Sequence, residues 1–346
     1  MEVRAWQKAR APGAGEQAVA LDDADCGYLL ALIARDLGSG SHVPELPPNP
    51  PQFFGPQSAA GAKVKTTDPF AIYEKLLEVQ RDASLYFFCL ATLQKARLKY
   101  ARILSSQPFP TIEQIGPRGL LQYGHLNAPA LTAFMFWRKW FFDIDNRAGQ
   151  QTGYLIEPVI ASAVGGEAYT AKRSPVRSHR DGKGRQVDCV REEQKDAYEI
   201  KVRVTIAASG QGRWTEELDF PIDCQRSGYR PVLVVLDETR NPKLTALAAA
   251  FKKHGGKVFI GQKAWRHLDE LAGETMATFI ERYVRVPLAA LADAPERPVP
   301  KLTAEEGKDR RTVVITVAGE TLTIPRDEKP VDEDDEGDED TATLPS

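Results

Sequence analysis

The sequence has few cysteines, and none of them forms a CxxC pair. Its 346 residues include four: Cys26, Cys89, Cys189 and Cys224. Their spacing fits neither a zinc site nor the disulfide framework of a small secreted protein. We therefore expect reduced, mostly buried thiols in a cytoplasmic protein.

Long hydrophobic runs are also missing. The first residues, MEVRAWQKARAPG, lack the apolar stretch of a signal peptide. The most apolar aromatic stretch, FMFWRKWFF, is interrupted by Arg138 and Lys139 and is too short to span a bilayer. No internal repeat is present. No Gly-rich phosphate loop follows a strand-like segment, which argues against an unrelated α/β enzyme that acts on a small molecule. We expect no membrane partner.

Acidic and basic residues are unevenly distributed along the chain. The composition is 42% hydrophobic and 27% charged, which suits one large globular domain or two modest ones. Residues 326–346 hold ten acidic residues against Arg326 and Lys329, a net charge of −8, so the remaining residues carry +5 of the total of −3. We expect residues 326–346 to be a disordered acidic tail on a mildly basic folded body.

Residues 1–146 are predicted to form a mostly helical N-terminal region. Apolar residues at helical spacing follow Glu16 and stop at Gly38. After a proline-rich loop, one long helix is predicted with Thr67 or Asp68 as its N-cap and its end near Ser105. A further helix is predicted after Asn127, whose aromatic residues are interpreted as core packing.

Residues 147–293 are predicted to form an α/β (α+β) core with a mixed sheet. A helical segment, QQTGYLIEPVIASAVGG, precedes a basic loop and a hairpin. After a loop with partial helix, the apolar run RPVLVVLDE is typical of a strand buried on both faces. Two further helices flank the short strand KVFIG. Residues 294–325 are interpreted as a linker and a β-hairpin that turns at residues 318–320.

The hairpin QVDCVREEQKDAYEIKVRV carries the candidate site. A turn centred between Glu193 and Gln194 places Asp188 opposite Glu199, and Lys201 shares their face because side chains alternate along a strand. An ordinary amphipathic ribbon is one interpretation. However, two directly opposed carboxylates repel each other unless a cation lies between them. Carboxylates, a backbone carbonyl and waters are the ligands that Mg²⁺ prefers, and a nearby lysine can act on an attacking water.

The segment that leads into the hairpin is basic, and we call residues 170–185 the basic loop. Its cations suit a polyanion such as DNA, although such loops are often only solvated. Base contacts in a groove could come from the loop after the hairpin or from residues 122–127, with a polar surface loop as the alternative for each. The DNA-binding candidates are Lys172, Arg173, Arg177, Arg180, Lys183, Arg185, Ser209, Gln211, Arg213 and Trp214, with Gln122, Tyr123, His125 and Asn127 as further candidates.

The pattern of Asp188 followed, after ten intervening residues, by Glu199-Ile200-Lys201 resembles the motif of the PD-(D/E)xK nucleases. The likeness covers about residues 147–272, and the order of helices and strands there is similar to the core of that family. Val187 stands where the motif has its proline. The resemblance implies that Asp188, Glu199 and the carbonyl of Ile200 bind Mg²⁺, that Lys201 acts on the attacking water, and that Glu157 adds an acidic group.

Within that superfamily the chain is similar to type II restriction endonucleases, especially the ApaLI-like group. The resemblance implies Mg²⁺-dependent double-strand cleavage of DNA at a short palindromic site, with 5′-phosphate ends. Cutting a palindrome calls for two sites on a two-fold axis, and therefore a homodimer, with the helical region as a dimer or clamp surface. A repair or junction nuclease of the same superfamily and a non-catalytic DNA-binding protein remain alternatives.

Overall fold

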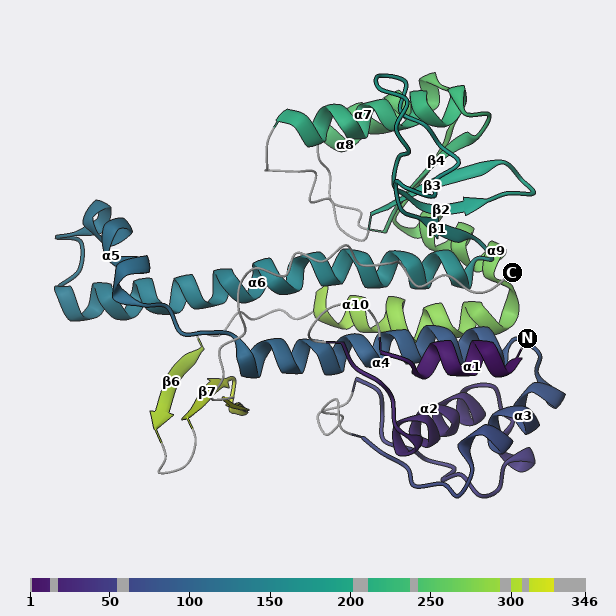
Figure 1. Cartoon of the computed structure of the whole chain (residues 1–346), viewed down its shortest axis with the longest axis horizontal. Coiled ribbons are helices and arrows are strands. Elements are labelled where there is room, and N and C mark those ends of the chain that lie inside the picture. The colour runs from purple at the N-terminus through teal and green to yellow at the C-terminus, as the bar shows by residue number, and fades with distance from the viewer. Residues whose placement is uncertain are drawn as a thin grey trace.

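The computed structural model describes residues 2–12, 18–54, 62–201, 211–236, 242–292, 300–306 and 311–326. Within these ranges it does not describe the side chains of residues 2, 4, 118, 149–158, 211–213, 292, 305, 306 and 311. A five-stranded sheet has two helices on one face and stacked layers of helices on the other, and a separate three-stranded sheet lies beside these layers (Figure 1).

The five-stranded sheet has its strands in the order of the chain. The first two pairings are antiparallel and the last two are parallel. The predicted mixed sheet is therefore confirmed, with β1 as an edge strand that the sequence did not predict. The strands are β1 (Glu167–Tyr169), β2 (Val187–Arg191), β3 (Asp196–Lys201), β4 (Arg230–Val235) and β5 (Lys257–Ile260).

Both faces of the sheet are covered by helices. On one face Tyr198, Ile200 and Val232 belong to the core that includes residues of α6 (Ala128–Ala163) and α9 (Gln262–Ile280). On the other face Ala197 and Leu233 pack with α7 (Gln211–Arg226) and α8 (Pro242–Lys253). The apolar run of β4 follows from this burial on two faces.

The helical region contains α1 (Glu2–Arg10), α2 (Asp23–Asp36), η1 (Gly40–His42), α3 (Pro69–Val79), α4 (Ala83–Ser106), α5 (Ile112–Gly119) and η2 (Leu120–Gln122). The single helix predicted up to Ser105 is wrong, because it is divided into α3 and α4. Asp68 caps α3 as predicted, but Gln80 has an extended backbone. The side chain of Gln80 donates a hydrogen bond to Thr275 across 2.5 Å, which ties the break to α9.

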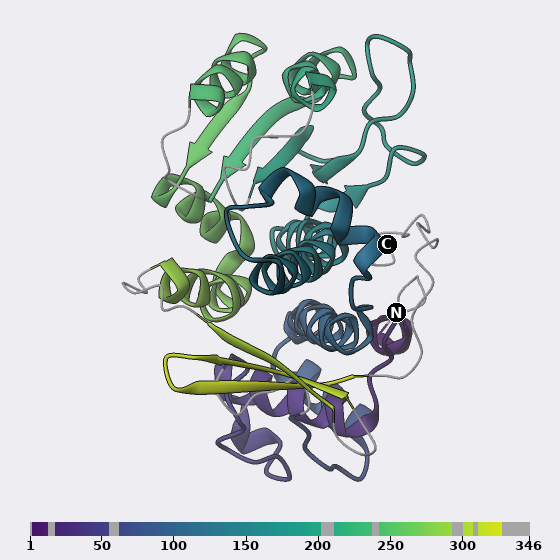
Figure 2. The same cartoon turned by 90° about the vertical axis from the view of Figure 1, so that its left-hand side faces the viewer.

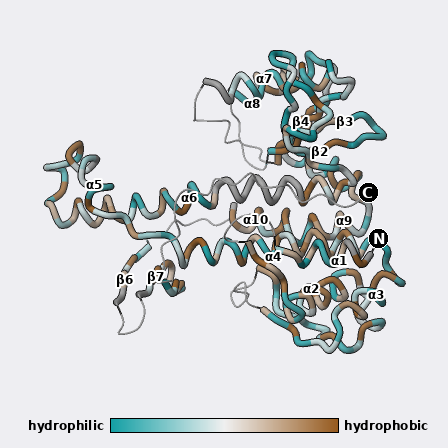
Figure 3. Tube along the Cα trace, in the orientation of Figure 1, coloured by the Kyte–Doolittle hydropathy of each residue, from teal (hydrophilic) through white to brown (hydrophobic). Residues whose placement is uncertain are grey.

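Helix α6 connects the helical region with the sheet. Asn127 caps it by accepting from the N–H of Ala130, and it then runs for 36 residues. It therefore passes without a break through residues 146 and 147, where the sequence suggested a boundary between regions. Figure 2 looks along α6 and α4 and shows them stacked between the sheet and α2. Hydrophobic residues are concentrated where α4, α9 and α10 (Val286–Ala292) stack, whereas the tip of the β2–β3 hairpin is hydrophilic (Figure 3).

The C-terminal part continues from α9 through the π-helix η3 (Glu281–Arg285) into α10 (Val286–Ala292). Strands β6 (Lys301–Glu306), β7 (Arg311–Val317) and β8 (Glu320–Pro325) form an antiparallel sheet in that order. The predicted hairpin is confirmed, but part of the predicted linker is a third strand, β6. Residues 327–346, most of the predicted acidic tail, lie outside the described residues. In the described ranges, no helix is long and apolar enough to cross a membrane.

Candidate active site

The β2–β3 hairpin has the register that the sequence predicts. Cys189 lies opposite Tyr198, and the turn occupies residues 192–195. Extending this register by one residue places Asp188 opposite Glu199, at the end of the hairpin away from the turn. The alternation of side chains is not regular at this end, because Val187 packs with Ala197 and α7 while Cys189 packs on the other face of the sheet. That Asp188 and Glu199 share one face therefore stays a prediction.

Lys201 is the centre of the polar cluster at this end of β3. Its Nζ lies 3.1 Å from Oε1 of Glu199, two residues earlier on β3. It also lies 3.2 Å from Oε1 of Glu217, which comes from α7 above the sheet. The side chains of Lys201, Glu199 and Glu217 are only 15%, 22% and 17% exposed. The ammonium group is thus held between carboxylates from two elements, with little access to bulk water.

Asp188 is held by the backbone of the neighbouring strand. Its Oδ2 accepts a hydrogen bond of 2.8 Å from the N–H of Ile200. The N–H and C=O of one strand residue point toward the same neighbouring strand. The carbonyl of Ile200 therefore faces β2 and Asp188, so the two groups that the resemblance assigns to metal binding lie on the same side of β3.

The electrostatics of the cluster keep Lys201 positively charged. Burial by itself would lower the pKa of Lys201, but the charges of Glu199, Glu217 and Asp188 outweigh it, and the pKa is raised above its usual value. Burial and then the charge of Glu199 also raise the pKa of the Cys224 thiol, which packs against the sheet on the inner side of α7. A protonated Lys201 can donate hydrogen bonds and stabilise negative charge, but in this state it cannot accept a proton.

The donor atoms of the cluster are of the chemical type that a hard divalent cation prefers. Asp188, Glu199 and Glu217 offer carboxylate oxygens, which are the ligands that Mg²⁺ prefers. Oε2 of Glu217 is buried and has no hydrogen-bond partner among the described residues. Lys201 stands between two of these carboxylates, and within the described part of the chain no three Asp, Glu, His or Cys residues are grouped closely enough to hold a metal.

Glu217 is the residue that sequence reasoning missed. The segment around it, RWTEELDFPIDCQR, was interpreted as a loop with partial helix, whereas it belongs to the 16-residue helix α7. Pro221 inside this helix weakened the helical signal, since proline removes an N–H donor. The spacing of Glu217, Phe220 and Cys224 is the sequence signal that could have found it, because residues three and four apart lie on one face of a helix. Phe220 and Cys224 pack against the sheet, so Glu217 faces β3.

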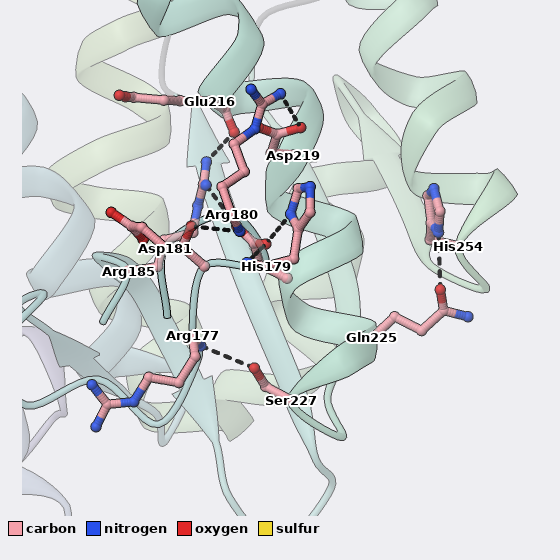
Figure 4. A network of polar contacts seen from close by, with 12 residues as sticks. Arg177, His179, Arg180, Asp181, Arg185, Glu216, Asp219, Gln225, Ser227 and His254 are labelled. Atoms are coloured by element: carbon pink, nitrogen blue, oxygen red, sulfur yellow. Dashed lines mark hydrogen bonds and ion pairs between the residues drawn. The ribbon is translucent and has the colours of Figure 1, made fainter. Parts of the chain in front are cut away.

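The basic loop is folded against α7 and is not an open arm (Figure 4). The carboxylate of Asp223, with a side chain that is 0% exposed, accepts from Arg185 at 2.7 Å. It also lies 2.6 Å from Nδ1 of His179. Arg180 donates to Asp219, one turn earlier on α7, across 3.1 Å. Two arginines predicted to bind phosphate are therefore paired with acidic residues of their own chain.

Other cations of the basic loop are more accessible. The side chains of Arg173 and Lys183 are 64% and 83% exposed, and their nearest carboxylate oxygens lie at 3.6 and 3.7 Å. Arg177 is exposed, and its backbone N–H donates to Ser227. Lys172 is exposed as well. The side chains of Arg173, Arg177 and Lys183 can reach a ligand without breaking a buried ion pair.

Several predicted residues cannot be placed. Glu157 lies on α6, within the stretch 149–158 whose side chains are outside the described set. Gln211 and Arg213 open α7, but their side chains are likewise not described, and Ser209 falls in the segment 202–210 that lies outside the described residues. Trp214 is partly buried against the core below α7 and α8, which makes it a packing residue.

Comparison of the sequence with known proteins identifies relatives among the restriction endonucleases. The family model described as ApaLI-like restriction endonuclease matches residues 59–285. The type II restriction enzyme ApaLI of Acetobacter pasteurianus is 41% identical over 332 residues, which cover 89% of this chain and 88% of that protein. The chain therefore belongs to the ApaLI-like restriction endonuclease family. No solved structure matches it.

Proposed function

We propose that this protein is a type II restriction endonuclease that cuts both strands of DNA at a short palindromic site and leaves 5′-phosphates, in the cytoplasm. The observation that carries the proposal is the convergence of Lys201 and Glu199 beside Asp188 at one end of β3, in a chain of the ApaLI-like family. A partly enclosed ammonium surrounded by carboxylates suits the hydrolysis of a phosphodiester, whose transition state gathers negative charge.

Asp188, Glu199 and the carbonyl of Ile200 would hold Mg²⁺ in this proposal. When bound, Mg²⁺ supplies a Lewis acid for the scissile phosphate and lowers the pKa of a coordinated water. Asp188 is already oriented for this role, because the N–H of Ile200 fixes one of its oxygens. Glu199 keeps its second oxygen free of the contact with Lys201, since only Oε1 faces the ammonium.

Lys201 is proposed to position the attacking water and to stabilise the transition state. Its Nζ lies 3.1 Å from Oε1 of Glu199, one of the proposed metal ligands, so a water bound there is within its reach. The ammonium can donate three hydrogen bonds. Two of them are directed at Glu199 and Glu217, so one N–H remains to orient a water or a phosphate oxygen.

Double-stranded DNA would approach across the exposed cations of the basic loop. Arg173, Arg177 and Lys183, with Lys172, are the proposed phosphate contacts. Gln211 and Arg213 remain proposed base contacts because they open α7, the helix that carries Glu217. Arg180 and Arg185 are better explained as internal partners of α7.

A palindromic target calls for two identical sites, and we propose a homodimer. The helical region supports this, because its α5 segment projects from the body at the far end of α6 (Figure 1). Leu120, Leu121 and Tyr123 next to α5 are 74%, 85% and 71% exposed. Clusters of exposed apolar side chains often mark surfaces where another protein binds.

The test is cleavage of unmethylated phage DNA by the purified protein with and without Mg²⁺, followed by sequencing of the new ends. We expect discrete bands only with Mg²⁺, and ends that all derive from one palindromic sequence with 5′-phosphates. Cleavage guided by junctions or other DNA shapes would show a repair nuclease instead. Binding to DNA without any cleavage in Mg²⁺ or Mn²⁺ would show a non-catalytic DNA-binding protein.

A further inference from the structure

Helix α7 restrains the ammonium of Lys201 from outside its own strand. A lysine side chain has four rotatable bonds, and an unrestrained ammonium samples many directions. Glu199 alone, two residues earlier on the same strand, restrains the ammonium from one side. Glu217 adds a second contact of 3.2 Å from α7. The two carboxylates together leave the ammonium one direction in which to donate.

Helix α7 is a rigid support for Glu217. Below it, Phe220 is 1% exposed and stacks on Phe251 of α8 with 5.7 Å between ring centroids. Above it, the basic loop binds the helix through Arg180 at Asp219 and through Arg185 at Asp223 (Figure 4). The backbone of α7 around Glu217 is therefore held both by the core and by the loop.

The second carboxylate oxygen of Glu217 indicates that this residue serves the active site and not only the packing of α7. Oε2 is buried and has no hydrogen-bond partner among the described residues. A buried acceptor without a partner costs stability. An apolar residue at this position would leave the largely buried ammonium of Lys201 with one charged partner fewer. A negative charge beside Lys201 is the property that such a replacement would lose.

We propose that Glu217 is a positioning residue that directs the Lys201 ammonium toward the reacting phosphate. It acts through Lys201 and does not touch the substrate. The inference rests on the proposed function, because Lys201 has a reacting phosphate to face only if this chain cleaves DNA. Position 217 must therefore carry a full negative charge on a side chain as long as that of glutamate.

The discriminating variant is Glu217→Gln, which keeps the size and one acceptor oxygen but removes the charge. We expect its single-turnover cleavage rate at saturating DNA and Mg²⁺ to fall by roughly 10- to 100-fold, the usual effect of losing a supporting group behind a catalytic one. DNA affinity in Ca²⁺, measured by gel shift, should not change. The half-saturating Mg²⁺ concentration should also remain that of the wild type.

The matched control is Glu216→Gln, which removes the same charge from the neighbouring residue of α7. The side chain of Glu216 is exposed, and its contact with the basic loop is made by its backbone carbonyl. We expect this variant to cut at the wild-type rate. Glu217→Asp is the second variant for the case that Glu217→Gln does not fold, because it keeps the charge but withdraws it by one methylene. It should show the same loss of rate without loss of DNA affinity.

Three results would overturn the proposal. The first is wild-type cleavage rates in both Glu217→Gln and Glu217→Asp. The second is a loss that appears only in DNA affinity, with the rate at saturation unchanged. The third is a loss that disappears at high Mg²⁺, which would make Glu217 a metal ligand instead. If the wild-type protein itself does not cut DNA, the proposed function fails and this inference fails with it, whereas a cutting wild type with an unaffected Glu217→Gln overturns this inference alone.

Discussion

Arg185 donates a hydrogen bond of 2.7 Å to Asp223, whose side chain is 0% exposed. The same carboxylate accepts from the backbone N–H of His179 across 2.7 Å. The loop around these residues is tightly closed, since a Cβ added to Gly184 would collide with the carbonyl of Ala171. An arginine used in this way is part of the interior of the protein, although its sequence context is that of a phosphate-binding loop.

Arg185→Ala should therefore reduce the stability of the fold, whereas Lys183→Ala should affect DNA binding. Arg185→Ala leaves the buried Asp223 short of a partner, and we expect the free energy of unfolding to fall by about 3 kcal/mol. Lys183→Ala removes a side chain that is 83% exposed, so its stability should change by less than about 0.5 kcal/mol. Instead, the slope of log DNA affinity against log salt should decrease by about one. Urea unfolding and salt-dependent gel shifts measure the two effects.

A loss of stability in Lys183→Ala, or a change in the salt dependence of DNA binding with unchanged stability in Arg185→Ala, would contradict these roles.

Neutralising Arg173 and Arg177 together should weaken binding equally on cognate and random DNA, because phosphate contacts carry no sequence information. If that double variant changed sequence preference, the loop would contact bases, and the placement of base contacts at Gln211 and Arg213 would have to be abandoned.

The acidic C-terminal segment should compete with DNA. Residues 327–346 contain ten acidic residues against Lys329, and a tethered polyanion near a basic surface occupies the sites that phosphates would use. We expect a chain that ends at Arg326 to bind non-specific DNA more tightly at low salt, with the same cleavage position and the same unfolding midpoint. Unchanged or weaker non-specific binding would show that the segment does not compete with DNA.

The end point of that truncation matters because Arg326 is part of the fold. Its guanidinium lies 4.8 Å from the ring centroid of Phe109 and 5.8 Å from that of Trp140. It also donates to the carbonyl of Leu104 across 2.5 Å. Ending the chain at Pro325 removes these contacts, so this shorter form should unfold at a lower urea concentration than the form that keeps Arg326.

His267 should make the fold less stable at low pH. Its ring stacks on Phe259 at 3.8 Å between centroids, and its Nε2 lies 3.3 Å from the hydroxyl of Tyr198. Burial lowers the pKa of His267, and among the surrounding charges Lys257 and Arg191 lower it further whereas Glu270 and Asp196 raise it. The unfolded chain therefore takes up a proton that the folded chain resists, and stability is lost as the pH falls through about 6.5.

The measurement is urea unfolding at pH 7.5 and pH 5.5 for the wild type and for His267→Phe. The phenylalanine keeps an aromatic ring on Phe259 but does not titrate. We expect the variant to lose less stability than the wild type on acidification. Equal losses in both proteins would show that His267 does not cause the acid sensitivity.

Glu157 is expected to support the reaction without defining where it occurs. It lies on α6 before the hairpin, and the resemblance to PD-(D/E)xK nucleases suggests an acidic group in that position. Glu157→Gln should slow cleavage and leave the sequence at the new ends unchanged. A wild-type rate in this variant would remove Glu157 from the site.

The parts of the site that the sequence predicted are those fixed by local geometry. The turn centred between Glu193 and Gln194 determines which residues of β2 and β3 face each other, and the alternation of side chains along β3 then brings Glu199 and Lys201 together. The buried strand β4 was predicted for a similar reason, since Pro231 to Val235 is apolar throughout and its length suits a strand.

The parts that the sequence did not predict depend on tertiary contacts. Glu217 joins the site only because α7 packs Phe220 and Cys224 onto the sheet. The pairing of Arg185 with Asp223 joins residues 38 positions apart in the chain, and charge patterning cannot reveal such a pair. The break between α3 and α4 is stabilised by the contact of Gln80 with Thr275, 195 residues away.

The most direct test of the account is the single-turnover cleavage rate of Glu199→Ala on its mapped cognate fragment, measured with DNA affinity in Ca²⁺. Glu199 is both a proposed metal ligand and a neighbour of Lys201, so its loss should reduce the rate by on the order of 10³-fold or more. Asp188→Ala and Lys201→Ala should behave in the same way, and all three should bind DNA nearly as well as the wild type. Cleavage by Glu199→Ala at close to the wild-type rate in Mg²⁺ would contradict the assignment of the active site to this end of β3.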